Sequence, residues 1–210
     1  MALAGLGIGP GDEVIVPAFT WVATANVVLY CGATPVFIDV DPQTYNLDVA
    51  QITAKVTDRT RAVIAVHLFG RCVDMDALRA GLPADVAIVE DAACAAGASW
   101  KGKPSGSLGD VAAFSFHPRK SVTTGEGGMV TTNDEALWKK MWSYKDHGKN
   151  FDSIYNKQHP PGFRWLHDSF GTNWRMMEMQ AVIGRIQLKK MTEWTEIRNH
   201  NMQRIYSAFE

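Results

Sequence analysis

Short apolar runs alternate with segments of helical spacing along most of the chain. Runs rich in valine, isoleucine and small apolar residues predict buried strands. They lie at 13–17, 34–40, 60–67, 86–90, 110–116 and 129–132. Between them, the spacing of apolar residues predicts helices at 20–30, 48–55, 75–80 and 133–145. Because strands and helices alternate, we expect an α/β fold with mostly parallel strands.

The pattern differs at the two ends of the chain. Residues 1–8 read as the last turns of an apolar helix, which a Gly-Pro-Gly sequence ends. Because no capping residue precedes this segment, we expect the chain to start inside a helix. Segments 174–190 and 193–209 predict two amphipathic helices, and the polar segment 147–171 predicts a long irregular loop.

Composition narrows the possible function classes. A length of 210 residues suffices for one sizeable domain, and a net charge of −1 without a basic run argues against a nucleic-acid surface. Cys31, Cys72 and Cys94 form no CxxC pair, which favours free thiols in a reducing compartment over disulfides or a zinc site. No stretch is long and apolar enough to span a bilayer, and no signal peptide opens the chain, so we expect a cytoplasmic protein.

A lysine follows one of the predicted buried strands directly. Pro118 ends the strand at 110–116, Lys120 lies in the turn, and 123–128 is a glycine-rich bend before a short returning strand. A loop lysine is usually a solvated charge. This lysine lies just past the carboxyl end of a buried strand, in a backbone shape held by glycines, which makes it a candidate for chemistry.

A second buried strand, at 86–90, delivers Glu90 and Asp91 at its carboxyl end. A lysine and an aspartate at the ends of strands in one sheet suit a pyridoxal phosphate (PLP) site. In such a site the lysine forms a Schiff base and the aspartate pairs with the pyridinium nitrogen. For Asp91 the alternative is a helix N-cap directly after the strand. Glu90 is expected to have a structural role.

Seven segments, in order along the chain, resemble the DegT/DnrJ/StrS family. They are PAFTWVATAN, GATPVFIDVD, VHLFG, EDAACAAGA, FSFHPRK, TTGEGG and TNWRMMEMQAVIG, and the resemblance covers Gly7 to about Gln187. Seven collinear segments are far more specific than a single motif. Members of this family are PLP-dependent sugar aminotransferases with the aspartate aminotransferase type I fold. The resemblance therefore implies a large PLP-binding domain with a mostly parallel mixed sheet flanked by helices.

The resemblance also implies roles for single residues. Lys120 would carry the cofactor, and some relatives with histidine at this position perform a dehydration instead. Trp21 matches an aromatic residue that stacks on the cofactor ring, although a core tryptophan is the alternative. Ser115 matches a hydroxyl that binds the phosphate, and Asn173 matches an asparagine that reaches the phosphate of the neighbouring subunit. Together these roles imply a homodimer with shared active sites.

Cys94 departs from the family pattern, which has glutamine or histidine near the phenolic oxygen of the cofactor. A thiol is a weak hydrogen-bond partner, so Cys94 either tunes this oxygen differently or packs without such a role. Asp91 fits the family pattern, and together with Lys120 this favours its cofactor role over the helix cap.

The resemblance implies that residues 1–192 are a large domain without its amino-terminal phosphate-binding segment. Residues 193–210 would begin the connection to a missing carboxyl-terminal small domain. The implied reaction moves an amino group from L-glutamate to a keto carbon of a nucleotide-linked deoxy sugar, as in polysaccharide or antibiotic amino-sugar biosynthesis. The alternative is a non-catalytic or regulatory fragment of the same fold, without turnover. A dinucleotide-binding domain fits poorly, since Gly7, Gly9 and Gly11 precede a strand instead of following one.

Overall fold

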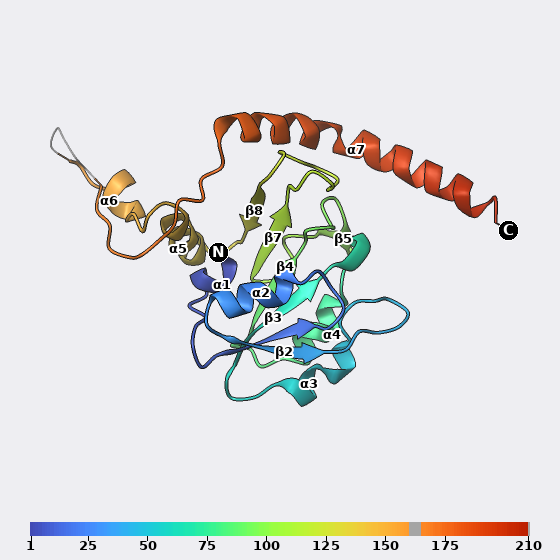
Figure 1. Cartoon of the computed structure of the whole chain (residues 1–210), viewed down its shortest axis with the longest axis horizontal. Coiled ribbons are helices and arrows are strands. Elements are labelled where there is room, and N and C mark those ends of the chain that lie inside the picture. Colours follow the sequence, from blue (N-terminus) through green and yellow to red (C-terminus); the bar gives the residue numbers. More distant parts are fainter. Residues whose placement is uncertain (160–164, 210) are drawn as a thin grey trace. The chain divides into compact units, whose positions relative to one another are not determined.

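The computed structural model describes residues 1–159 and 165–209. These residues form a six-stranded sheet in the order β2-β1-β3-β4-β7-β8 (Figure 1). Its strands are β1 (Glu13–Pro17), β2 (Thr34–Ile38), β3 (Thr60–Val66), β4 (Ala87–Asp91), β7 (Val111–Ser115) and β8 (Gly128–Thr131). The pairs β1–β2, β1–β3, β3–β4 and β4–β7 are parallel, which confirms the predicted α/β fold. A separate antiparallel ribbon consists of β5 (Ser99–Trp100) and β6 (Lys103–Pro104).

Helices pack on both faces of the six-stranded sheet. The described helices are α1 (Ala2–Gly5), α2 (Ala23–Tyr30), α3 (Ile52–Lys55), α4 (Met75–Ala80), α5 (Glu135–Lys145), α6 (Phe151–Tyr155) and α7 (Glu178–Tyr206). Side chains of α1, α2 and α5 join one core cluster, and those of α3 and α4 join the other. Val14 and Val16 of β1 belong to the first cluster and Ile15 to the second, because successive side chains of a strand point to opposite faces. Burial on both faces explains why these three consecutive positions are all apolar.

Two predicted helix starts are confirmed by their capping hydrogen bonds. The Asp134 carboxylate accepts hydrogen bonds from the backbone N–H groups of Ala136 and Leu137, at 2.8 and 3.1 Å, where α5 begins. Asp48 accepts a hydrogen bond of 3.0 Å from the N–H of Ala50, at the start of a short 3-10 turn that leads into α3. Each carboxylate satisfies amide donors that have no partner inside the helix.

Two sequence predictions about the last third of the chain are wrong. The segments 174–190 and 193–209 do not form two helices, because α7 runs unbroken from Glu178 to Tyr206. No glycine or proline follows Gly184 within α7, so nothing local interrupts its backbone hydrogen bonds. The loop expected at 147–171 contains α6, whose first turn is capped by Asn150. The Pro-Pro-Gly sequence of that loop lies outside the described residues.

The chain divides into two compact units. The first comprises Met1–Phe114 and Met129–Arg175, and the second comprises Ser115–Gly128 and Met176–Glu210. The first unit holds most of the sheet. The second unit holds the segment with the candidate lysine, together with α7. The expected domain boundary near residue 192 falls inside α7 and stays a prediction.

In the described part of the chain, no helix combines the length and the apolar character needed to cross a membrane. The same residues contain no group of three or more histidine, cysteine, aspartate or glutamate side chains that could hold a metal ion. None of the three cysteines, all of which lie in the described residues, forms a disulfide bond.

Candidate active site

Asp91 is the last residue of β4, and its carboxylate is held from two sides. One oxygen, Oδ2, accepts a hydrogen bond of 3.2 Å from the hydroxyl of Thr24. The other, Oδ1, accepts a hydrogen bond of 3.1 Å from the N–H of Ala93. Thr24 is a buried residue of α2, so its hydroxyl is fixed by the packing of that helix on the sheet. The carboxylate at the end of β4 is therefore oriented before any ligand arrives.

The helix-cap alternative for Asp91 is wrong. In the described chain, turns follow β4, and the next helix is α5. The hydrogen bond from Ala93 closes a local turn two residues on, an arrangement that aspartate side chains favour in loops. Asp91 therefore belongs to a strand-to-turn junction, which is the usual place for ligand-binding groups in an open α/β sheet.

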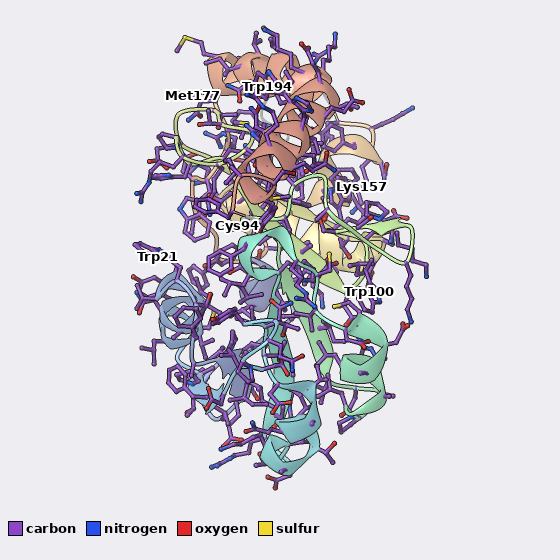
Figure 2. All side chains as sticks on the ribbon, turned by 90° about the vertical axis from the view of Figure 1, so that its right-hand side faces the viewer. Trp21, Cys94, Trp100, Lys157, Met177 and Trp194 are labelled. Atoms are coloured by element: carbon purple, nitrogen blue, oxygen red, sulfur yellow. The ribbon has the colours of Figure 1, made fainter. Side chains whose placement is uncertain are left out.

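Trp21 lies just before α2 and is not a core tryptophan. Its side chain is 73% exposed, and it projects from the outer edge of the α2 segment (Figure 2). An exposed indole leaves its π face available for stacking on a planar ring. The core alternative for Trp21 is thus wrong, and the stacking role stays a prediction.

Cys94 lies in the turns that follow Asp91 and is also exposed (Figure 2). The cofactor role of Cys94 and the packing alternative both stay predictions. The backbone at this point makes a close approach, because a Cβ added to Gly70 would lie 3.2 Å from the carbonyl oxygen of Cys94. Gly70 also has a φ of +85°, a conformation that glycine adopts readily.

Lys120 lies in the second unit, in a tight turn after β7. Its N–H donates a hydrogen bond of 2.9 Å to the carbonyl oxygen of His117, which closes the turn. The Ser115 hydroxyl accepts a hydrogen bond of 3.3 Å from the N–H of His117. The serine and the lysine predicted to serve the cofactor are thus tied to one backbone turn.

The glycine-rich bend is attached to this turn and to α7. Phe116 donates its N–H to the carbonyl oxygen of Gly127 at 2.9 Å, and its own carbonyl accepts the N–H of Thr124 at 3.1 Å. Gln187 of α7 accepts a hydrogen bond of 2.8 Å from the N–H of Thr123 through its Oε1. A side chain at Gly184 of α7 would place its Cβ 2.9 Å from the Thr124 methyl group, so a glycine is needed for this packing. Within the second unit, the glycine-rich bend is therefore hydrogen-bonded both to the backbone of Phe116 and to α7.

Asn173 lies in the first unit, where its backbone pairs with the end of α5. Asp146 and Asn173 form an isolated antiparallel bridge, and the N–H of Trp174 donates to the carbonyl oxygen of Lys145 at 2.9 Å. The Asn173 side chain is exposed.

The predicted site residues are divided between the two units. Trp21, Asp91, Cys94 and Asn173 belong to the first unit, and Ser115 and Lys120 to the second.

The expected structural role of Glu90 is confirmed. Its partner is His67, which the sequence did not indicate. The Glu90 side chain is fully buried, and its Oε2 lies 2.9 Å from Nε2 of His67, which is also fully buried. The backbone N–H groups of Gly106, Leu108 and Gly109 donate to the same carboxylate at 2.7–2.8 Å. Glu90 therefore ties β3 and the loop before β7 to β4, directly beside Asp91.

Hydrogen bonds decide the ionisation of Glu90. Burial favours the neutral acid, but the hydrogen bonds from His67, Gly109, Gly106 and Leu108 outweigh it and lower the pKa of Glu90. Nδ1 of His67 accepts the N–H of Val73 at 3.2 Å, so the ring proton is assigned to Nε2, facing Glu90.

We expect Glu90→Gln to lower the free energy of unfolding by about 1.5–3 kcal/mol, because a neutral amide would replace a carboxylate that accepts hydrogen bonds from His67 and from three backbone N–H groups. The pKa of the folded state lies below the ordinary value, so the stabilisation by Glu90 is present above that value. It is lost as the pH falls through the lowered pKa of the folded state. Urea unfolding from pH 7 down to pH 3 should show this loss, with a smaller pH dependence in the variant. Glu126→Gln, which changes an exposed carboxylate, is the control. Equal stability of the two variants would contradict this role of Glu90.

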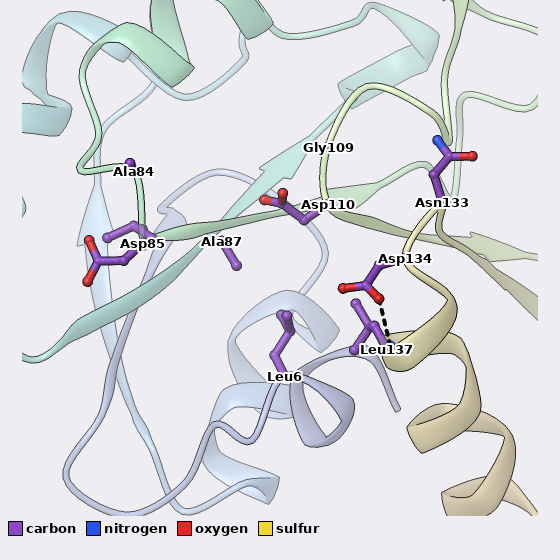
Figure 3. A pocket seen from close by; sticks show the side chains of 10 residues that line it. Leu6, Ala84, Asp85, Ala87, Gly109, Asp110, Asn133, Asp134 and Leu137 are labelled. Carbon is purple, nitrogen blue, oxygen red and sulfur yellow. Dashed lines mark hydrogen bonds between the residues drawn. The ribbon is translucent and has the colours of Figure 1, made fainter.

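A hollow of about 450 Å³ lies at the opposite ends of β4 and β7, where these strands begin (Figure 3). Two of its carboxylates already have structural partners. Asp134 caps α5, and Asp110 accepts hydrogen bonds of 2.7 Å from the N–H of Ile88 and from the guanidinium of Arg79. Ligands of open α/β sheets bind at the carboxyl ends of the strands, so we assign a structural role to this end.

The sheet is parallel, and a central strand presents an oriented carboxylate at its carboxyl end. These features are typical of α/β domains that bind a ligand at their strand ends. Residues 1–210 match the DegT/DnrJ/EryC1/StrS aminotransferase family. The chain belongs to this family. It is 48% identical over 194 residues to GDP-perosamine synthase of Caulobacter vibrioides, a match that covers 92% of the chain and 50% of the relative.

Solved structures confirm the fold. The aminotransferase from Psychrobacter cryohalolentis is 54% identical, with a TM-score of 0.94 over 99% of this chain and 53% of that one. A protein of Streptococcus pneumoniae, assigned provisionally as a sugar aminotransferase and solved in its PLP form, is 30% identical. Its TM-score is 0.88 over 99% of this chain and 56% of that one. The chain thus spans about half the length of the relatives that it matches.

Proposed function

We propose that the protein with this chain is a PLP-dependent aminotransferase. It moves an amino group from L-glutamate to a keto carbon of a nucleotide-linked deoxy sugar. The observation that carries this proposal is the oriented carboxylate of Asp91 at the end of β4 in a chain of this aminotransferase family. The similarity to a GDP-perosamine synthase supports a nucleotide-linked sugar as the substrate.

The donor groups of the chain fit PLP. The carboxylate of Asp91 suits a protonated pyridine nitrogen, the exposed indole of Trp21 suits a planar ring, and the amine of Lys120 suits an aldehyde. Ser115 and the exposed amide of Asn173 supply donors for a phosphate. Cys94 would lie at the phenolic oxygen. When bound, PLP supplies an electron sink for a carbanion next to the amino group.

The residues of the chain then divide the work. Asp91 keeps the proton on the pyridine nitrogen, because a nearby negative charge favours the charged ring. Lys120 would hold the cofactor and, once released from it, would take a proton from the amino-bearing carbon and deliver it to C4′ of the cofactor. Trp21 covers one face of the ring and excludes water.

The proposal extends to assembly and location. Asn173 would reach the phosphate in a neighbouring subunit, so we propose a homodimer in which each active site draws on both copies. Three cysteines without a disulfide among the described residues support a reducing compartment, and we propose the cytoplasm.

Borohydride reduction tests the proposed lysine. The protein is incubated with PLP, reduced and digested, and the labelled peptide is sequenced. We expect the cofactor on the peptide that contains residues 115–124. A label on another lysine, such as the exposed Lys101, would overturn the assignment of Lys120. Absence of any visible absorbance band and of any label would favour the non-catalytic alternative.

A further inference from the structure

His67 is a fully buried histidine directly after β3, and the proposed reaction gives it no task. Its main-chain N–H donates to the carbonyl oxygen of Asp91 at 3.0 Å. In its ring, Nε2 lies 2.9 Å from Oε2 of Glu90, and Nδ1 accepts the N–H of Val73 at 3.2 Å. This single residue therefore contacts both the main chain of Asp91 and the side chain of the residue before it.

The end of β4 is held from both neighbouring strands. On the side of β3, His67 donates to the carbonyl oxygen of Asp91, and on the side of β7 the N–H of Ala92 donates to the carbonyl oxygen of Ala113 at 2.9 Å. Side chains of consecutive strand residues point to opposite faces. The carboxylate of Asp91 faces α2, whereas Glu90 faces His67. The pair of Glu90 and His67 thus supports the strand end from behind the Asp91 carboxylate.

The turn that follows His67 is strained. Phe69 has a φ of +56°, and its ring is 76% exposed, so burial of this ring does not stabilise the turn. Instead, the buried Asn46 accepts the N–H of Leu68 at 3.1 Å and donates to the carbonyl oxygen of Arg71 at 3.0 Å. Strained backbone persists where its surroundings enforce it, and it is frequent beside functional sites. The turn therefore fixes the main chain of His67 in one place.

Filling the core does not explain a buried pair of polar side chains. Apolar residues of similar volume are often as stabilising as a buried pair of ionisable groups, or more so. The backbone N–H groups of Gly106, Leu108 and Gly109 also donate to the Glu90 carboxylate. A buried network whose polar groups are paired specifies one arrangement of the chain. Here the arrangement includes the main chain at position 90 and hence the position of Asp91.

We propose that His67 is a positioning residue for Asp91. Its ring, through Glu90, and its main-chain N–H together hold the end of β4 where the Asp91 carboxylate meets the ring nitrogen of PLP. The inference rests on the proposed function, in which Asp91 pairs with that nitrogen. A misplacement of about 1 Å in a site can cost about a hundredfold in rate, so a rigid support for this carboxylate has a large effect.

The test compares PLP with a deaza analogue in which a C–H group replaces the ring nitrogen. Only PLP can use the charge of Asp91, so the ratio of the two affinities, measured by equilibrium dialysis, reports the alignment of this carboxylate. We expect His67→Leu to lower the preference for PLP by about tenfold, because a charge-assisted contact is partly lost. His67→Gln should keep the preference, since an amide can donate to Glu90 and accept from Val73.

Thr60→Val is the matched control. Thr60 is buried at the other end of β3, and its Oγ1 accepts the N–H of Thr57 at 2.9 Å. This variant loses a buried hydrogen bond and some stability, but its preference for PLP should not change. An equal fall in both variants, or no fall in His67→Leu, would overturn the proposal. If His67→Leu does not fold, Glu90→Gln weakens the same network and should also lower the preference, and an unchanged ratio there would equally overturn it.

Carbon NMR of the carboxyl groups follows Asp91 directly in the protein without cofactor. The signal of Asp91 is assigned by its loss in Asp91→Asn. We expect its chemical shift to change in His67→Leu and to stay constant in Thr60→Val, and a constant shift in both would contradict the positioning role. Because this measurement needs no cofactor, a failure of PLP to bind would refute the proposed function, while the NMR signal would still decide whether His67 positions Asp91.

Discussion

Replacing Lys120 with alanine should abolish the visible absorbance of the cofactor-loaded protein and lower turnover by about a thousandfold or more. The amine at this position has two tasks in the proposed reaction, covalent attachment of the cofactor and proton transfer. The fold should survive, because Lys120 lies in a turn whose hydrogen bond to His117 comes from the backbone. Absorbance spectra, single-turnover kinetics with L-glutamate and urea unfolding measure the three effects.

Arg119→Ala is the matched control for this experiment. Arg119 is an exposed neighbour in the same turn, so its replacement removes a positive charge without removing the candidate amine. Its spectrum should resemble that of the unsubstituted protein. If Lys120→Ala kept the absorbance band and the reaction with L-glutamate, Lys120 would not be the cofactor lysine.

Local signals in the sequence were enough to predict the six strands of the main sheet and two helix starts. The apolar run at Val14–Val16 indicates a strand buried on both faces, and both core clusters draw on it. Asp134 precedes a segment of helical spacing, and it caps α5 as expected. These features depend on residues that are close together in the chain, which is why they can be recognised without a structure.

Contacts between distant residues were not predictable in this way. Thr24 and Asp91 are 67 positions apart, and nothing in the composition of α2 indicates that one of its hydroxyls reaches β4. His67 and Glu90 meet because β3 and β4 are neighbours, a register that the sequence pattern does not specify. The sequence shows His67 within the segment VHLFG but does not show that it faces Glu90.

The ion pairs of Asp146 at the end of α5 could not be predicted for a related reason. Lys149 is close to Asp146 in the sequence, but Arg175 reaches Asp146 only because the chain returns beside α5. The error at α7 is of the opposite kind. Two helices were predicted on either side of residue 191, although no helix-breaking residue lies between them.

Asp91→Asn should lower turnover by at least about a hundredfold while leaving the protein folded and able to bind PLP. The amide has nearly the shape of the carboxylate and can still accept the hydrogen bond from Ala93. It lacks the negative charge that holds a proton on the pyridine nitrogen, so the cofactor would lose its strength as an electron sink. Steady-state kinetics and the affinity for PLP, measured together, separate a loss of chemistry from a loss of binding.

Thr24→Val provides a graded comparison for Asp91→Asn. Valine has nearly the same shape as threonine but removes the hydroxyl that donates to Oδ2, so the carboxylate keeps its charge and loses part of its orientation. A hydrogen bond to a charged group is worth about 1.5–3 kcal/mol, and Ala93 still holds the other carboxylate oxygen, so we expect only part of this to be lost and turnover to fall by about tenfold. The order of the two effects is the critical result. If Thr24→Val were as inactive as Asp91→Asn, the site would depend on the packing of α2 and not on the charge of Asp91. If Asp91→Asn were fully active, Asp91 would not be the partner of the cofactor nitrogen.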